Sequence, residues 1–180
     1  MRKAMLLGAL MTFVLLLACG VALAATITGT DEADFLEGTP RSDTIRGFRG
    51  EDTIKGRASG DTLRGYGGND DMGGGGGGDD MYGGRGADKM RGGGGDDKMY
   101  GGPGRDTIYG KEGNDVTDGQ GGGDTLVGGT GRDTIIAGSG SGHQIFAQDG
   151  EQDLICVSPD AAGRIVTADN KDELIDNNSC

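Results

Sequence analysis

Aspartate recurs at a strict interval of nine residues through the middle of this 180-residue chain. Five residues before each aspartate stands a glycine, and two residues after it stands a large apolar residue in eleven of the twelve repeats, Thr117 being the exception. Carboxylates repeated in this way supply the hard oxygen ligands that calcium prefers, and a fixed period indicates a repeat architecture. The series is Asp34, Asp43, Asp52, Asp61, Asp70, Asp79, Asp88, Asp97, Asp106, Asp115, Asp124 and Asp133.

The residues that follow each aspartate are expected to form the strands that hold it in place. In the triplet 107–109 (TIY), strand alternation points the middle side chain opposite to its neighbours, so the apolar residue faces inward. Odd and even repeats then form two parallel sheets around a narrow apolar seam. Met72 is expected to stack on Met90, and Met81 on Met99.

The outward-facing residues favour a coil of eighteen residues over one of nine. At a separation of eighteen, Asp71 neighbours Lys89 and Asp80 neighbours Lys98, which are pairs of opposite charge. A nine-residue coil would place Asp71 on Asp80, and like charges directly opposite each other in a sheet are destabilising. The same spacing predicts a ladder of Tyr82 and Tyr100.

Written out, the repeat is G-x-x-G-x-D-x-U-x, where U is a large apolar residue. Its clearest copies are residues 83–91 (GGRGADKMR), 101–109 (GGPGRDTIY) and 128–136 (GGTGRDTII). From Thr28 to Ile136 the chain resembles the haemolysin-type (RTX) calcium-binding repeat family. The resemblance implies an all-β fold, a parallel β-roll in which six residues turn and three form a strand. It also implies that calcium lies between turns stacked on the same side.

Stacked coils would bring like charges close together. Parallel strands lie about 4.8 Å apart, so Asp88 is expected near Asp70 and Asp106, where two charges about 4 Å apart repel by about 4 kcal/mol near a protein surface. Calcium fits between them because it accepts carboxylate and carbonyl oxygens in flexible geometry, whereas magnesium keeps more water and zinc prefers His or Cys. His143 lies where the period breaks and is expected to be a loop residue.

The strongest sites are expected between Gly65 and Ile136. In early copies Glu32, Arg41 and Ser59 replace the glycine at the fourth repeat position, which predicts weak or absent sites there. Any single aspartate could instead be a turn cap or a solvated carboxylate. The predicted ligands are Asp70, Asp79, Asp88, Asp97, Asp106, Asp115, Asp124 and Asp133, with the turn glycines Gly74, Gly83, Gly92, Gly101 and Gly110.

Residues 1–25 read as a secretory signal peptide. Arg2 and Lys3 precede an apolar run and small residues that end at Ala24 and Ala25, where we expect cleavage. Lipidation of Cys19 is the alternative. Loss of Arg2 and Lys3 changes the formal charge from -12 to -14, leaving no basic patch suited to nucleic acid and no membrane span.

Composition limits what the remaining chain can build. With 41 Gly, 33% hydrophobic residues and 4% aromatics, only a thin core is available. We expect a β-roll over residues 26–136 and irregular repeats with a small C-terminal cap over residues 137–180. The mature chain keeps Cys156 and Cys180, which are predicted to form a disulfide in an oxidising compartment, two free thiols being the alternative.

These features predict a secreted calcium-binding protein that folds on binding calcium. It is expected outside the cell or at the cell envelope as a structural or adhesive module, with cell-surface or matrix components as partners. An RTX-type toxin or hydrolase fragment and an ice-binding solenoid are the alternatives. The sequence has no H-E-x-x-H and no G-x-S-x-G motif, so an enzyme is not expected, and acidic and basic residues interrupt its threonine rows.

Overall fold

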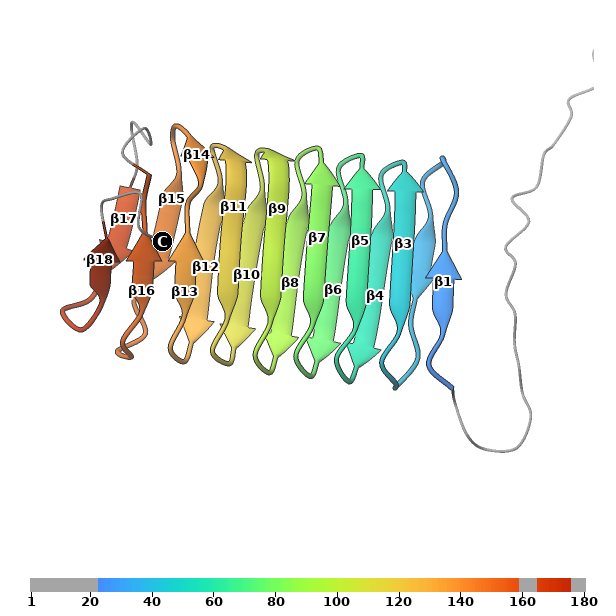
Figure 1. Ribbon diagram of the computed structural model, residues 1–180, viewed down its shortest axis with the longest axis horizontal. Helices are drawn as coiled ribbons and strands as arrows, with labels where there is room; N and C mark the ends of the chain where they lie inside the picture. Colours follow the sequence, from blue (N-terminus) through green and yellow to red (C-terminus); the bar gives the residue numbers. More distant parts are fainter. Residues whose placement is uncertain (1–22, 159–164, 176–180) are drawn as a thin grey trace, which may run out of the picture.

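In the computed structural model, which describes residues 23–158 and 165–175, the chain winds into a solenoid made of strands (Figure 1). The described residues contain no helix, and so no helix among them could cross a membrane. Two parallel sheets form the walls of the solenoid, with alternate repeats contributing to alternate sheets. The strand order confirms the predicted all-β fold with two repeats in each coil.

Counting the strand at Thr26–Thr28 as the first repeat, odd-numbered repeats build the sheet that we call sheet A. Its strands are paired in the order β1, β3, β5, β7, β9, β11, β13, β16 and β18, and β14 pairs with β11. Their bounds are β1 Thr26–Thr28, β3 Thr44–Arg49, β5 Thr62–Gly67, β7 Asp80–Arg85, β9 Lys98–Gly104, β11 Val116–Gly122, β13 Thr134–Ile136, β14 Ser139–Gly140, β16 Leu154–Cys156 and β18 Glu173–Ile175.

Even-numbered repeats build sheet B. Its order is β17, β15, β12, β10, β8, β6, β4 and β2. The bounds are β2 Phe35–Glu37, β4 Thr53–Ala58, β6 Asp71–Gly76, β8 Lys89–Gly94, β10 Thr107–Glu112, β12 Thr125–Thr130, β15 Gln144–Ala147 and β17 Ile165–Ala168.

The register has the predicted step of eighteen residues. Asp71 pairs with Lys89 between β6 and β8, and Asp80 pairs with Lys98 between β7 and β9. Tyr82 and Tyr100 stack with ring centroids 5.2 Å apart. One expectation is wrong: the strands from β3 to β12 span six or seven residues instead of three, because pairing resumes beyond the inward-facing glycine of the next repeat.

The core is a single row of apolar side chains on each sheet. Met72 lies beside Met90 and Met81 beside Met99, and all four are fully buried, as predicted. Thr117 occupies the same row and is also fully buried, with no hydrogen-bond partner for its hydroxyl group. The remaining large members of the row are Leu36, Ile45, Ile54, Leu63, Ile108, Leu126, Ile135, Ile145 and Ile155.

The irregular end of the chain continues both sheets. Ile145 pairs with Leu126 and Ile155 pairs with Ile135, so the register survives insertions that lengthen these coils. Strands β16, β17 and β18 lie within residues 137–180, where the sequence predicts irregular repeats and a small cap. Cys156 is buried at the end of β16, whereas Cys180, its predicted disulfide partner, lies outside the described residues.

Candidate metal centre

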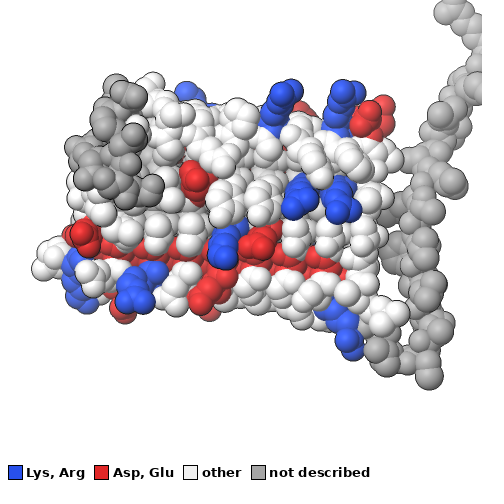
Figure 2. All heavy atoms as spheres, in the orientation of Figure 1, with Lys and Arg blue, Asp and Glu red and all other residues white. Residues whose placement is uncertain are grey.

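The periodic aspartates form two rows along the solenoid, one where the strands of each sheet begin. Figure 2 shows an acidic line running along the solenoid at the strand starts of sheet A. We call the row beside sheet A column A, and it contains Asp43, Asp61, Asp79, Asp97, Asp115, Asp133, Asp153 and Asp172. Column B lies beside sheet B and contains Asp34, Asp52, Asp70, Asp88, Asp106 and Asp124.

One oxygen of each carboxylate is used by the preceding coil. The backbone N–H of Asp70 donates to Oδ1 of Asp88 at 2.9 Å, and the N–H of Asp79 donates to Oδ1 of Asp97 at 2.8 Å. The carbonyl oxygen of Asp88 accepts the N–H of Thr107 at 2.8 Å, which fixes the aspartate backbone to the next strand of its sheet. Each aspartate therefore bonds to neighbouring coils through its side chain and its backbone.

The second carboxylate oxygen, Oδ2, has no hydrogen-bond partner over most of both columns. These oxygens are buried, and an unsatisfied buried acceptor costs about 1–3 kcal/mol, more when it is charged. Such a row is stable only when protons or cations neutralise it. The unpartnered atoms are Oδ2 of Asp52, Asp61, Asp70, Asp79, Asp88, Asp97, Asp106, Asp115, Asp124, Asp133 and Asp153.

The first aspartate of each column differs from the rest. Oδ2 of Asp34 accepts the backbone N–H of Thr30 at 2.6 Å and its hydroxyl at 2.9 Å. Oδ2 of Asp43 accepts the N–H of Thr39 at 2.5 Å and its hydroxyl at 3.0 Å. In both repeats the threonine four residues earlier satisfies Oδ2, so this oxygen needs no cation. The hydrogen bonds therefore give a structural reason to expect the weak early sites that the sequence predicts.

The first glycine of each repeat makes room for the unpartnered oxygen. A Cβ atom added to Gly92 would overlap Oδ2 of Asp97 and would lie 2.8 Å from the carbonyl oxygen of Gly110 in the next coil. A carboxylate oxygen and a backbone carbonyl oxygen therefore converge on the same space, which only a residue without a side chain leaves open. The predicted glycines Gly74, Gly83, Gly92, Gly101 and Gly110 all lie in this position, and none has a positive φ.

Burial raises the pKa of the column carboxyl groups from Asp52 to Asp153. For Asp97 and Asp106 the pKa rises to about 7, mainly because the groups are removed from water, and repulsion from column neighbours adds to the rise. The backbone N–H that each carboxylate accepts acts in the opposite direction. For Asp70 and Asp79 the pKa rises to about 6 for the same main reason. The columns therefore hold their negative charge against a considerable electrostatic cost.

The donor set suits calcium. Among the described residues no three His, Cys, Asp or Glu side chains converge as a metal cluster. A cation held here would take carboxylate oxygens from one column and backbone carbonyl oxygens of the inward-facing glycines, a mixture that calcium accepts and zinc does not favour. The predicted aspartate ligands all lie in these columns. The predicted glycines lie inside strands β6 to β10 and not in turns, because pairing continues through them.

Sequence reasoning missed part of each column. Asp52 and Asp61 have the same unpartnered Oδ2 as the later aspartates, although they precede the stretch predicted to bind. Asp153 and Asp172 extend column A through the longer coils, with the N–H of Asp153 donating to Oδ1 of Asp172 at 3.2 Å. Asp153 before Ile155 is recognisable in the sequence as a degenerate repeat, and Leu174, two positions beyond Asp172, could have revealed the last member.

His143 lies outside the strands, between β14 and β15, as expected for a loop residue. His143 is fully buried and takes the place of an aspartate at the end of column B, where its Nδ1 accepts the N–H of Asp124 at 3.2 Å. The chain inserts one residue before it, which hid this equivalence in the nine-residue count.

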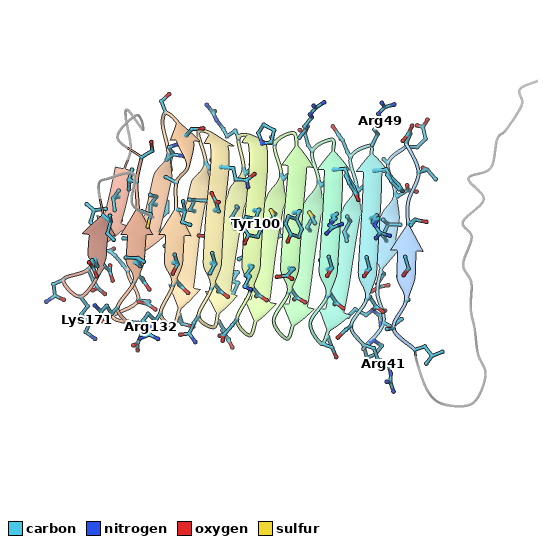
Figure 3. The ribbon with its side chains drawn as sticks, viewed as in Figure 1. Arg41, Arg49, Tyr100, Arg132 and Lys171 are labelled. Carbon is cyan, nitrogen blue, oxygen red and sulfur yellow. The ribbon has the colours of Figure 1, made fainter. Side chains whose placement is uncertain are left out.

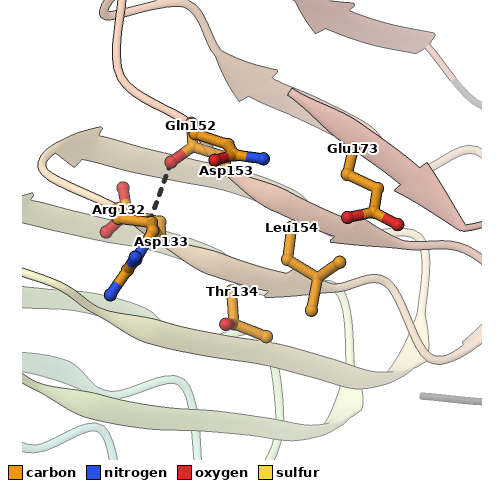
Figure 4. A pocket seen from close by; sticks show the side chains of 7 residues that line it. All are labelled: Arg132, Asp133, Thr134, Gln152, Asp153, Leu154 and Glu173. Carbon is orange, nitrogen blue, oxygen red and sulfur yellow. Dashed lines mark hydrogen bonds between the residues drawn. The ribbon is translucent and has the colours of Figure 1, made fainter. Parts of the chain in front are cut away.

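Near the other column, a shallow hollow of about 300 Å³ lies where β13, β16 and β18 begin (Figure 4). Asp133 and Asp153 line it, and the N–H of Asp133 donates to Oδ1 of Asp153 at 2.8 Å. Arg132 and Glu173 line it as well. The hollow therefore belongs to the end of column A.

Comparison with known proteins agrees with this geometry. The model of the RTX calcium-binding nonapeptide repeat matches in four copies, at residues 28–58, 47–81, 82–117 and 118–141. No curated protein matches the chain. The matched copies cover more than half of the sequence and carry both aspartate columns up to Asp133, and the chain belongs to the RTX calcium-binding nonapeptide repeat family.

Proposed function

We propose that this protein is an exported β-roll that folds when calcium fills its two aspartate columns, and that it acts outside the cell as a structural or adhesive module. The observation that carries the proposal is the series of buried Oδ2 atoms without a hydrogen-bond donor. The family match independently indicates a calcium-binding β-roll.

The proposed ligands follow from the columns. The carboxylates of Asp70, Asp79, Asp88, Asp97, Asp106, Asp115, Asp124 and Asp133 would hold the ions, together with the backbone carbonyl oxygens of Gly74, Gly83, Gly92, Gly101 and Gly110. The unpartnered oxygens of Asp52 and Asp61 extend this set toward the N-terminus. Asp34 and Asp43 are left out because Thr30 and Thr39 already satisfy them.

Calcium binding and folding are coupled by the physics of the columns. Folding must order a glycine-rich chain, which loses much conformational entropy, and must bury rows of like charges. The thin core offsets only part of these costs. A cation that binds the folded columns and not the unfolded chain adds its binding free energy to the stability of the fold.

A calcium titration followed by circular dichroism tests this coupling. We expect little β signal in calcium-free protein, a cooperative gain as calcium is added, and a much smaller effect from magnesium at the same concentration. Native mass spectrometry of the folded form should count several bound ions, with five or six strong sites predicted. Full β signal in protein stripped of calcium would overturn the proposal.

We propose export because the sequence predicts a signal peptide. The position of the first strand is compatible with cleavage at the predicted site. The first strand starts at Thr26, directly after the predicted cleavage site, and residues 1–22 lie outside the described residues. The N–H of Ala25 donates to Oδ1 of Asp43 at 2.6 Å, so cleavage after Ala24 would keep every strand and this bond. The mass of protein recovered outside the cytoplasm tests the site: a Cys19-lipidated form or an uncleaved chain would contradict it.

A disulfide between Cys156 and Cys180 is part of the same proposal. It would close a loop of about 24 residues and stabilise the C-terminal coils by about 3 kcal/mol on the loop-entropy model. Masses of the intact exported protein before and after reduction, with alkylation of free thiols, test the pairing. Two alkylated cysteines without reduction would contradict it.

The structural role rests on the surfaces that the sheets offer. Thr53, Asp71, Lys89 and Thr107 are consecutive neighbours on sheet B, so charged residues interrupt the threonine row that an ice-binding face would need. We expect no thermal hysteresis and no release of ester or peptide products. Either activity would replace the structural role.

A further inference from the structure

The outer face of sheet A carries cationic and aromatic side chains over the N-terminal half of the solenoid. Figure 2 shows Lys and Arg groups gathered there, and Figure 3 shows Tyr100 projecting from the middle of the same face. We call the cluster the cationic–aromatic face and define it by Arg46, Phe48, Arg64, Tyr66, Tyr82 and Arg85, which come from β3, β5 and β7. The chain as a whole has a formal charge of -12, so this concentration of arginine is unusual for the molecule.

The arginines of this face lack acidic partners. Arg46 and Arg64 are direct neighbours in the register, an arrangement that is repulsive between like charges. Within the described part of the chain no carboxylate forms an ion pair with Arg46, Arg64 or Arg85. On sheet B, by contrast, Arg57 pairs with Glu37 at 2.9 Å and Arg91 pairs with Asp71 at 2.6 Å.

The aromatic side chains are held on this face at a conformational cost. Phe48 and Tyr66 stack with centroids 5.5 Å apart, and they have φ of 83° and 74°. Gly84 and Gly102 occupy the same repeat position in the next two coils of sheet A with positive φ, a conformation that is unfavourable for a bulky residue. Arg57, Lys111 and Gln120 have positive φ at the same repeat position, so the strain belongs to the repeat, and the exposed aromatic stack is what distinguishes this face.

The chemistry of the face selects an anionic partner. Guanidinium groups bind carboxylates and sulfates through paired N–H donors, and Arg64 is held in place over the Tyr82 ring with its Cζ 5.2 Å from the centroid. The side chains of Phe48, Tyr66 and Tyr82 are 37–43% exposed. The face therefore offers exposed cationic donors beside aromatic surface.

The arrangement of the donors selects an extended partner. Arg46 and Arg64 are adjacent in the register, about one strand spacing of 4.8 Å apart, and Arg85 lies on the next strand of the sheet. Three guanidinium groups on three consecutive coils therefore follow the solenoid axis, as the charges of a linear polymer would require. The rings of each stacked pair cover one another, so they do not form an open platform for nucleic-acid bases. We propose that the cationic–aromatic face binds an extended acidic polysaccharide through its carboxylate or sulfate groups. This inference goes beyond calcium-dependent folding.

Binding is tested on calcium-saturated protein whose β signal is complete, so that a failure to fold is not mistaken for a failure to bind. The probes are short hyaluronate and heparin oligosaccharides, with a neutral oligosaccharide, a single-stranded oligonucleotide and phosphatidylglycerol vesicles for comparison. Calorimetry should show salt-dependent binding of an acidic oligosaccharide and none of the neutral one. Binding of neither acidic sugar, or stronger binding of the oligonucleotide or vesicles, would overturn the proposal.

Paired variants locate the binding surface. The double variant Arg46→Gln/Arg64→Gln should bind about tenfold more weakly, as expected for the loss of charge-assisted hydrogen bonds. Lys55→Gln/Arg91→Gln removes the same charge at the same repeat position on sheet B and should change affinity less than about twofold. Equal loss in both variants would mean that only net charge matters and would reject this surface.

A glycine substitution separates binding from folding. Tyr66→Gly relieves the positive φ of Tyr66 and should keep or raise stability while weakening oligosaccharide binding several-fold. Lys111→Gly relieves a φ of 94° at the equivalent position on sheet B and should leave binding unchanged. Unaltered binding by Tyr66→Gly, or self-association of the protein through this face in sedimentation, would contradict the proposal.

Discussion

The backbone N–H of Asp79 bonds to one carboxylate oxygen of Asp97 at 2.8 Å, while the other oxygen of that carboxylate is buried without a donor. The two oxygens thus have different tasks. One fixes the distance between coils, and the other is the oxygen that we propose as a cation ligand. Removing the charge of one aspartate should therefore affect ion binding more than coil geometry.

Asp97→Asn is expected to lower the number of bound calcium ions and to raise the calcium concentration needed for folding. The amide oxygen of asparagine can still accept the N–H of Asp79, so the loss reports the missing charge. The expected cost is about 1–3 kcal/mol, the range for removing a charged partner. Native mass spectrometry and the midpoint of the calcium titration measure the effect.

Asp34→Asn is the matched control for Asp97→Asn, because Thr30 already satisfies Oδ2 of Asp34. The calcium count should stay unchanged in this variant. An equal loss of ions in both variants would show that hydrogen-bonded carboxylates bind as well as unpartnered ones.

Gly92→Ala is expected to destabilise the folded state by about 1–3 kcal/mol or more, as overpacking does in a close-packed interior. The added methyl group would overlap Oδ2 of Asp97 and displace either the carboxylate or the next coil. Gly73→Ala has nothing within 4 Å of its new atom and should change stability by less than about 0.5 kcal/mol. Denaturant unfolding at saturating calcium compares the two, and similar stabilities would disprove the proposed role of the first glycine.

Acidification is expected to stabilise the calcium-free fold. The pKa values of Asp97 and Asp106 rise to about 7 on folding from the ordinary 3.8, so the folded chain holds protons that the unfolded chain releases. By linkage, this contribution is complete below about pH 3.8 and is lost as the pH rises through about 7. Circular dichroism of protein stripped of calcium should show more β structure at pH 4.5 than at pH 7.5.

Calcium reverses this dependence, because protons and calcium compete for the same carboxylates. Calcium affinity should fall as the pH is lowered from 7 toward 5, the range in which Asp70 and Asp79, with pKa values of about 6, become protonated. Calorimetry at several pH values measures the affinity. An affinity that is independent of pH would exclude the column carboxylates as the ligands.

Thr117→Val is expected to stabilise the fold by about 1 kcal/mol. The Thr117 hydroxyl is buried in the apolar row without a partner, and valine replaces it with a methyl group of similar size. Thr107→Val, at a partly exposed outward position, should have little effect. If the thermal midpoint of the Thr117 variant does not rise, a water molecule bound to the hydroxyl is indicated.

The architecture could be predicted from the sequence because every repeat favours the same strand register. The nine-residue period, the inward apolar residue and the charge pairs such as Asp71 with Lys89 all require the same register, which the structure confirms. Insertions concealed Asp172 and the role of His143, because the register there depends on pairing across the sheet and not on counting along the chain.

The sequence could not predict that one oxygen of each carboxylate accepts a hydrogen bond while the other has no partner. This difference depends on where the backbone N–H of the preceding coil lies, which is a property of the folded turns. For the same reason the hydroxyl caps of Thr30 and Thr39 were not foreseen. Spacing placed the aspartates correctly, and three-dimensional contacts decided which of them lack a partner.

We expect the two threonine-capped repeats, which together span one coil, to set the direction in which the solenoid assembles. They lie at the end of the chain that the ribosome makes first, and they complete their carboxylate hydrogen bonds without help from solution. An ordered first coil offers free strand edges, and the next coil can pair with these edges as calcium binds to it. Folding would then begin at this end and add one coil after another. The chain would not have to select a nucleation site among many equivalent repeats.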